Sequence, residues 1–325
     1  MNPMDQFSFY VYGWGPQPPT MRQLAQTAQR AEELGFYSIG IPYHLTVPES
    51  WMFTSLGNSY LLDSMAVLPA LAQATRTIRI GVHSLILPLL HPYVWAKYLA
   101  SVDVVSEGRL IPGMCIGWSM RDFDAVGVDI KQRGKMTEEQ IEVITRLWTE
   151  DRVTHEGRFY HLRDVSIDPK PVQKPHPPIW YGGGFPAIPR AARYAQYIAP
   201  FALTPKQVEM EYIPRLQEEN QRWGTETKIV LNNFVLIEED DDKLKNEARP
   251  RLDQCVDFPA MVGPDVKAED LVICGPPERC AQLIRELQEA GVSHFLLDFN
   301  YHGLESFDFL LRQAELFVEK VVPLL

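Results

Sequence analysis

The stretch Ile78–Trp118 reads IRIGVHSLILPLLHPYVWAKYLASVDVVSEGRLIPGMCIGW. Its first segment, Ile78–Leu87, is almost continuously apolar, which is typical of a strand covered on both faces in a parallel sheet. Apolar residues then recur at helical spacing, and Leu110–Ile116 follows as a second apolar strand. The stretch therefore predicts a strand–helix–strand unit of an α/β fold.

Polar or aromatic residues interrupt this unit at two places. His83-Ser84 lies within the first strand, and Gly117-Trp118 ends the second. Parallel α/β folds place their chemistry at the carboxyl ends of strands. We therefore expect both pairs to border a functional site.

The same alternation extends over the whole chain. Strand candidates begin near residues 7, 38, 78, 110, 178, 197, 228 and 294, and each is followed by helical material. This pattern predicts a (β/α)8 TIM barrel with insertions, formed by residues 1–325 as one domain. A doubly wound open sheet is the alternative, but the chain has neither a GxGxxG nor a GxxxxGK[ST] motif.

Three segments between the predicted barrel elements have their own signals. Val153–Gln173 alternates as a hairpin outside the barrel, and Asp122–Gly134 has the weak periodicity of a loop. Thr137 and Gln140 fit a capping box at the start of the next helix.

Composition excludes several classes of protein. With 46% hydrophobic and 22% charged residues, the chain is typical of a globular protein. A formal charge of −11 argues against nucleic acid or an anionic membrane as a partner. The four cysteines form no CxxC pair, and the eight histidines show no metal-ligand spacing. We expect a cytoplasmic protein without a metal site, a signal peptide or a membrane span.

Long motifs in a fixed order carry a family resemblance. They are Leu87–Leu110 (LPLLHPYVWAKYLASVDVVSEGRL), Ile116–Gly134 (IGWSMRDFDAVGVDIKQRG), Leu147–Gly184 and Cys274–Phe299 (CGPPERCAQLIRELQEAGVSHFLLDF). With these motifs the chain resembles the bacterial luciferase-like family of flavin-dependent oxidoreductases. The resemblance implies a (β/α)8 barrel that uses reduced FMN with dioxygen or, in a large branch, the deazaflavin coenzyme F-420 in hydride transfer.

The preferred function implied by the resemblance is a monooxygenase that oxidises a small organic substrate. Reduced FMN would come from a separate flavin reductase, and the protein would be a homodimer, as many family members are. Deazaflavin-dependent hydride transfer is one alternative. A non-catalytic flavin-binding protein is another, because Ile116 and Phe185 stand where relatives have residues that contact the phosphate.

His44 is the candidate catalytic residue. It follows the second predicted strand, and imidazole can transfer a proton near neutral pH. The resemblance places this histidine near the flavin or the substrate; a loop histidine bonded to backbone is the alternative. Tyr43 precedes it where many deazaflavin-dependent members have an acidic residue, and Tyr43, Trp14, Trp51 and Phe53 are candidates for a substrate pocket.

The resemblance also implies a set of cofactor-binding residues. His83 and Ser84 match a strand bulge with a non-prolyl cis peptide beneath the flavin ring, although a buried polar pair with satisfied hydrogen bonds is the alternative. Three further residues would line the pocket beside the flavin ring: Cys115, Gly117 and Trp118.

The phosphate would lie at the other end of the site. Gly182, Gly183 and Gly184 follow a predicted strand, and bare backbone N–H groups favour an anion; a tight turn is the alternative. Arg133 could pair with the phosphate or with the substrate, or lie in solvent.

Overall fold

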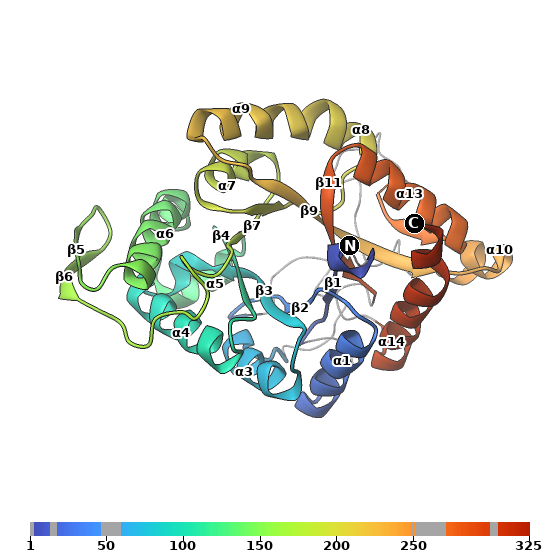
Figure 1. Ribbon diagram of the computed structural model, residues 1–325, viewed down its shortest axis with the longest axis horizontal. Helices are drawn as coiled ribbons and strands as arrows, with labels where there is room; N and C mark the ends of the chain where they lie inside the picture. The colour runs from blue at the N-terminus through green and yellow to red at the C-terminus, as the bar shows by residue number, and fades with distance from the viewer. Residues whose placement is uncertain (1–2, 14–17, 47–59, 249, 251–270, 300–304) are drawn as a thin grey trace.

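The computed structural model describes residues 3–13, 18–46, 60–248, 250, 271–299 and 305–325. Its centre is a closed barrel of eight parallel strands in the order β9-β11-β1-β2-β3-β4-β7-β8, in which β8 pairs back onto β9 (Figure 1). The barrel strands are β1 (Phe7–Tyr10), β2 (Ser38–Ile41), β3 (Arg79–Ile86), β4 (Leu110–Cys115), β7 (Trp180–Gly182), β8 (Tyr197–Ala199), β9 (Lys228–Ile237) and β11 (Val292–Asp298).

Helices surround this barrel. The α-helices are α1 (Met21–Glu33), α3 (Ser64–Ala74), α4 (Pro92–Val105), α5 (Met120–Val126), α6 (Arg133–Thr149), α7 (Ile188–Tyr194), α8 (Pro205–Gln207), α9 (Ile213–Trp223), α10 (Asp241–Lys243), α13 (Pro277–Glu289) and α14 (Phe307–Leu316). Short 3-10 or π turns add η1 (Pro3–Gln6), η2 (Leu87–Leu89), η3 (Ile130–Gln132), η4 (Phe185–Ala187), η5 (Val208–Tyr212), η6 (Leu244–Ala248), η8 (Phe317–Val321) and η9 (Val322–Leu324). Across the described ranges, none of these helices has the length and apolarity needed to span a bilayer.

The predicted (β/α)8 barrel is confirmed, with a strand at each of the eight expected places. Strand β10 (Ile273–Gly275) adds a parallel pairing to β9 outside the ring. The expected hairpin is also present, as antiparallel β5 (Val153–Glu156) and β6 (His161–Val165), which project from the barrel beside α6 (Figure 1).

Two local predictions are wrong. The segment expected as a loop contains helix α5, which ends at Gly127 in a left-handed conformation with φ 69°. Helix α6 begins at Arg133 rather than at Thr137, whose side chain is buried inside the helix. The reason is that Asp129 caps the preceding turn η3, which leads directly into α6 and overrides the local capping signal.

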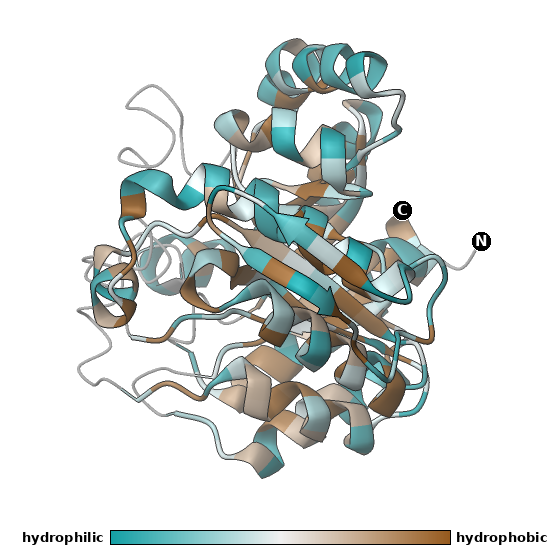
Figure 2. Ribbon diagram, turned by 90° about the vertical axis from the view of Figure 1, so that its left-hand side faces the viewer, coloured by the Kyte–Doolittle hydropathy of each residue, from teal (hydrophilic) through white to brown (hydrophobic). Residues whose placement is uncertain are grey.

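Buried apolar side chains form two clusters. Brown, hydrophobic stretches alternate with teal, hydrophilic ones along the strands and helices (Figure 2). The larger core lies between strands and helices, and a smaller cluster includes Tyr10, Ile111, Trp180, Val230 and Leu296. These two layers explain why the barrel strands are apolar on both faces.

The smaller cluster is adjoined by the imidazole of His83. A Cβ added at Gly40, on β2, would lie 2.1 Å from the His83 Cδ2, and one at Gly81, on β3, would lie 2.8 Å from its Nε2. A Cβ at Gly113, on β4, would lie 3.1 Å from the His83 Nδ1. Missing side chains on three adjacent strands therefore make room for the ring, which stacks on Trp180 with centroids 4.9 Å apart. Burial lowers the pKa of His83 to about 3, so the ring is neutral.

Candidate active site

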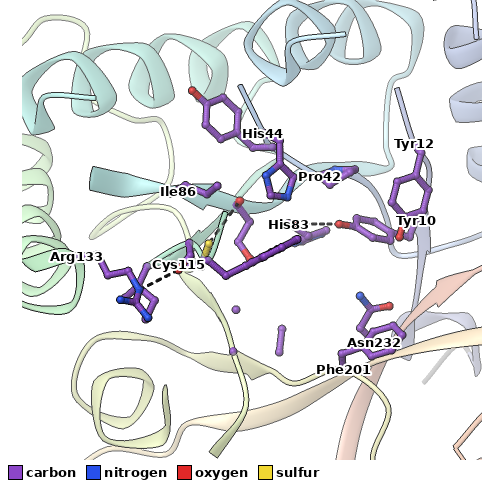
Figure 3. Close-up of a pocket in the computed structure, with 18 residues that line it drawn as sticks. Tyr10, Tyr12, Pro42, His44, His83, Ile86, Cys115, Arg133, Phe201 and Asn232 are labelled. Carbon is purple, nitrogen blue, oxygen red and sulfur yellow. Dashed lines mark hydrogen bonds between the residues drawn. The ribbon is translucent and has the colours of Figure 1, made fainter. Parts of the chain in front are cut away.

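A pocket of about 500 Å³ opens at the carboxyl ends of the barrel strands, within the range of small-molecule sites (Figure 3). Every barrel strand except β11 contributes to its lining, directly or through the residues that follow it. The lining residues are Tyr10, Tyr12, Pro42, Tyr43, His44, His83, Ser84, Ile86, Cys115, Ile116, Gly117, Trp118, Arg133, Gly182, Gly183, Ala199, Phe201 and Asn232.

The structure brings most of the predicted site residues together in this one pocket. Gly184 is the exception among those described: it follows the two lining glycines but does not itself line the pocket. The other candidates for the substrate pocket, Trp14, Trp51 and Phe53, lie outside the described residues.

His83 and Ser84 form part of the pocket lining. The register between β3 and β4 shifts between Val82 and Leu85, and the His83–Ser84 peptide bond is cis. The expected bulge is thus present. The Tyr10 hydroxyl donates a hydrogen bond to the His83 carbonyl.

The neighbouring strands approach this bulge closely. The Cys115 thiol donates a weak hydrogen bond to the Ser84 carbonyl, at 3.8 Å. Burial raises the pKa of Cys115 to about 11, so the thiol stays protonated and is not a nucleophile at neutral pH. A Cβ at Gly182 would lie 2.1 Å from the Ser84 Oγ, so a side chain there would have to displace Ser84. The bulge is therefore enclosed by β4 on one side and β7 on another.

His44 makes a specific contact that the sequence did not predict. Its Nδ1 lies 2.8 Å from Oδ2 of Asp122, whose side chain is fully buried. The other carboxylate oxygen, Oδ1, accepts hydrogen bonds from the backbone N–H and the hydroxyl of Thr46, both at 2.9 Å. Asp122 thus joins the strand end that carries His44 to helix α5.

The charge state of Asp122 follows from these contacts. Burial by itself raises the pKa of the carboxyl, but the hydrogen bonds and charge of His44 and the hydrogen bonds of Thr46 outweigh it and hold the pKa below its usual value. The group is therefore an ionised, acceptor-only carboxylate at neutral pH. His44 Nδ1 must then carry the hydrogen of the shared bond, so Nε2 is the ring nitrogen that can gain or lose a proton.

Two aromatic residues adjoin this pair. Trp118 packs edge-on against the His44 ring with centroids 5.8 Å apart, and it is 53% exposed at the pocket wall. Tyr43 packs against Trp95 and is buried. Burial, together with the charges of Asp63 and Asp122, raises the pKa of Tyr43, so its phenol stays neutral.

The pocket has one positive end. Arg133 donates from Nε to the Gly117 carbonyl at 3.1 Å and from Nη1 to the Ile130 carbonyl at 2.9 Å. Among the described lining residues, Arg133 is the one arginine or lysine, and no carboxylate is present. This end therefore suits an anionic group of a ligand.

The opposite end of the pocket was missed in the sequence. It is formed by Tyr10, Tyr12, Phe201 and Asn232, which Figure 3 shows on the side away from Arg133. Two features of the sequence could have indicated this end. Tyr10 and Tyr12 are two residues apart and so share one face of an extended segment, and Asn232 is a polar residue within an apolar strand. Where the structure describes side chains, no three potential metal ligands gather in a cluster.

Sequence comparison matches residues 7–294 to the family described as luciferase-like monooxygenase. One relative is the FMNH(2)-dependent dimethylsulfone monooxygenase of Pseudomonas putida, 32% identical over 53% of this chain and 44% of that protein. Another is the F420-dependent glucose-6-phosphate dehydrogenase of Microbacterium testaceum, 31% identical over 58% of this chain and 55% of that protein. The chain thus matches about half the length of these curated relatives.

Solved structures share the fold over almost the full chain. The monooxygenase RslO1 from Streptomyces bottropensis has a TM-score of 0.82 at 22% identity, covering 98% of this chain and 99% of that one. An F420-dependent secondary alcohol dehydrogenase, in complex with an F420-acetone adduct, has a TM-score of 0.75 at 21% identity, covering 98% of each chain. At these identities the likeness concerns the fold alone.

Proposed function

The chain belongs to the luciferase-like monooxygenase family of oxidoreductases, and we propose that it is a monooxygenase that uses reduced FMN and dioxygen to oxidise a small organic substrate. The observation that carries the proposal is the pocket itself. It combines the His83–Ser84 bulge, two glycines, Gly117 and Gly182, against which neighbouring side chains pack closely, and a cation at one end. We also propose that residues 1–325 act as one domain.

The residues present fit a flavin mononucleotide. Arg133 would hold the phosphate, with Gly182 and Gly183 allowing the backbone to approach it. The isoalloxazine would lie against His83, Ser84 and Cys115, which line the pocket together. When bound, reduced FMN supplies the electrons that activate dioxygen for transfer of one oxygen atom to the substrate.

The protein would contribute to the chemistry by orienting the reactants, excluding water and transferring one proton. His44 would accept or return a proton at Nε2, while Asp122 holds the ring and its tautomer through Nδ1. Aromatic walls that include Tyr43 and Trp118 would limit the access of water to the reacting atoms.

Tyr43 favours FMN over the deazaflavin. Its neutral phenol stands where many deazaflavin-dependent members have an acidic residue, and no carboxylate replaces that residue in the described pocket lining. Deazaflavin-dependent hydride transfer is therefore the second candidate, with support from the relatives that use that coenzyme.

Two partners follow from the proposal. A separate flavin reductase would supply reduced FMN, as the oxygenase component of a flavin-dependent trigonelline monooxygenase among the relatives suggests. A second copy of the chain would cover the adjacent helices α3 and α4 (Figure 1). Helix α3 has no charged residue, and the outer side of α4 exposes Val94, Val104 and Val105.

The test is equilibrium binding of reduced FMN and of the deazaflavin under anaerobic conditions, followed by admission of oxygen with candidate organic substrates. We expect binding of reduced FMN and substrate-dependent oxygen uptake. Tight binding of the deazaflavin without affinity for reduced FMN would identify the hydride-transfer enzyme instead. Flavin binding without any turnover, for any reductase and substrate offered, would favour the non-catalytic flavin-binding protein.

A further inference from the structure

Asn232 is a polar side chain in the pocket whose amide oxygen is not used in a hydrogen bond. It lies on β9, lines the pocket, and its Oδ1 is buried without a hydrogen-bond partner. A buried amide oxygen without a partner costs free energy in a folded protein, so its retention calls for a physical explanation. A ligand in the pocket would supply the missing partner.

The backbone holds this side chain in place. The Asn232 N–H donates to the Pro200 carbonyl at 2.9 Å, and the Asn232 carbonyl accepts from the Ala202 N–H at 2.9 Å. On its other side, Asn232 is in register with Leu296 of β11. The backbone of the strand is thus fixed from both sides. The terminal amide rotates easily and can present either its oxygen or its nitrogen to the pocket.

The polar groups nearest to Asn232 along the lining already have partners. The Tyr10 hydroxyl donates to the His83 carbonyl, and the Tyr12 hydroxyl donates to Oδ2 of Asp298 at 3.0 Å. Asn232 is therefore the described side chain at this end that offers both a donor and an acceptor to a ligand. Figure 3 shows its amide directed into the pocket, on the side opposite Arg133.

The two ends of the pocket orient an elongated ligand. If Arg133 holds the phosphate, the far edge of the ring system extends toward Asn232. In FMN that edge is a pyrimidine with an N–H (N3) between two carbonyls. An amide matches it, because its C=O accepts from N3–H while its NH₂ donates to an adjacent carbonyl.

We propose that Asn232 binds the pyrimidine edge of the flavin ring and so sets how far the ring enters the barrel. This inference rests on the proposed function, since it takes a flavin as the ligand. The deazaflavin carries the same pyrimidine edge, so the inference does not depend on which of the two coenzymes binds.

A chemical double-mutant cycle tests the contact directly. Reduced FMN and its N3-methyl analogue are titrated anaerobically into the 325-residue chain and into its Asn232→Leu variant, and dissociation constants are read from the flavin absorbance and fluorescence. In the unsubstituted protein, N3-methylation should weaken binding at least about tenfold, because it removes the donor and leaves the amide unpaired. In Asn232→Leu, FMN should bind about tenfold more weakly, and both flavins should bind equally.

The matched control is Asn233→Leu, the same change on the next residue of β9. Asn233 does not line the pocket, although its side-chain amide is also buried without a partner. This variant should keep both affinities of the unsubstituted protein, and circular dichroism of both variants checks that they fold.

The outcomes separate this inference from the proposed function. If the protein binds FMN but Asn232→Leu keeps both the affinity and the N3-methyl penalty, Asn232 does not contact the ring and the inference is wrong, while the function stands. If neither FMN nor the deazaflavin binds to the unsubstituted protein, the proposed function fails and the inference fails with it. If only the deazaflavin binds, Asn232→Leu should weaken its binding about tenfold, and an unchanged affinity would overturn the inference.

Discussion

Replacing Asp122 with Asn should reverse the tautomer of His44. The native carboxylate accepts from the His44 Nδ1–H through one oxygen and from two donors of Thr46 through the other. An Asn side chain has only one oxygen, and the two donors of Thr46 retain it. The amide NH₂ then faces His44 Nδ1, which must become an acceptor, so the ring hydrogen moves to Nε2.

The magnitude follows from the bonds exchanged. A hydrogen bond to a charged group contributes about 1.5–3 kcal/mol, and a neutral one contributes about 1 kcal/mol. In the Asp122→Asn variant, neutral hydrogen bonds replace the bond between the carboxylate and His44 and the two bonds that the carboxylate accepts from Thr46. Its free energy of unfolding should therefore fall by about 1–2 kcal/mol at neutral pH. With the hydrogen on Nε2, His44 can no longer accept a proton there, so turnover should fall about 10²–10⁴-fold.

The loss of stability should depend on pH with a definite sign. The pKa of Asp122 is lowered in the folded protein, so its contribution is complete above the unfolded carboxyl pKa and is lost as the pH falls through the folded pKa. The difference between the unsubstituted protein and Asp122→Asn should thus shrink in acid. Urea unfolding at neutral and acid pH measures it.

The tautomer itself is measured by ¹⁵N–¹H correlation of the ring nitrogens in protein labelled at its eight histidines. The His44 signals, assigned with His44→Gln, should show Nδ1 protonated in the unsubstituted protein and Nε2 protonated in Asp122→Asn. Thr46→Val is the matched control: it removes the hydroxyl but keeps the backbone N–H and the carboxylate, so Nδ1 should stay protonated. An Asp122→Asn protein that keeps Nδ1 protonated would refute the reasoning.

Three further predictions concern packing, acid stability and the phosphate. Gly113→Ala should lower the free energy of unfolding by about 1–3 kcal/mol in urea titrations, because the new Cβ would lie 2.1 Å from the backbone oxygen of Val82; unchanged stability would show that β3 and β4 can separate at no cost. Glu32→Gln should lower the free energy of unfolding by about 1 kcal/mol, a value discounted for solvent contact. Glu32 accepts hydrogen bonds from three consecutive backbone N–H groups and from the Thr77 hydroxyl. Burial opposes these bonds, yet they lower the pKa of Glu32 to about 2, so the cost should fade as the pH drops from about 4.5 toward 2, and a pH-independent cost would contradict this. Arg133→Ala should weaken the binding of FMN about tenfold or more and leave the binding of riboflavin, which has no phosphate, unchanged in parallel titrations. Equal effects on both ligands would show that Arg133 does not contact the phosphate.

The barrel was predictable because each parallel strand is covered on both faces. Ile78–Leu87 and Leu110–Ile116 are apolar throughout for this reason, and their positions were correct to within a residue or two. The pocket residues next to those strand ends, His83, Ser84, Gly117 and Trp118, followed from the same rule, since the carboxyl ends of parallel strands meet at one edge.

The contacts across the barrel were decided by tertiary structure alone. Asp122 meets His44 from 78 residues away, and this pairing required helix α5 in a segment whose weak periodicity indicated a loop. Asn232 is one of two adjacent asparagines on β9, and only the closed barrel determines which of them lines the pocket.

The glycines illustrate the same division. Their sequence positions show where side chains are missing, but not what fills the space. The His83 ring occupies the space beside Gly40, Gly81 and Gly113 only because β2, β3 and β4 are adjacent around the ring. Periodicity along a chain reports which faces of an element are buried, whereas the partner of each polar group depends on how distant elements are brought together.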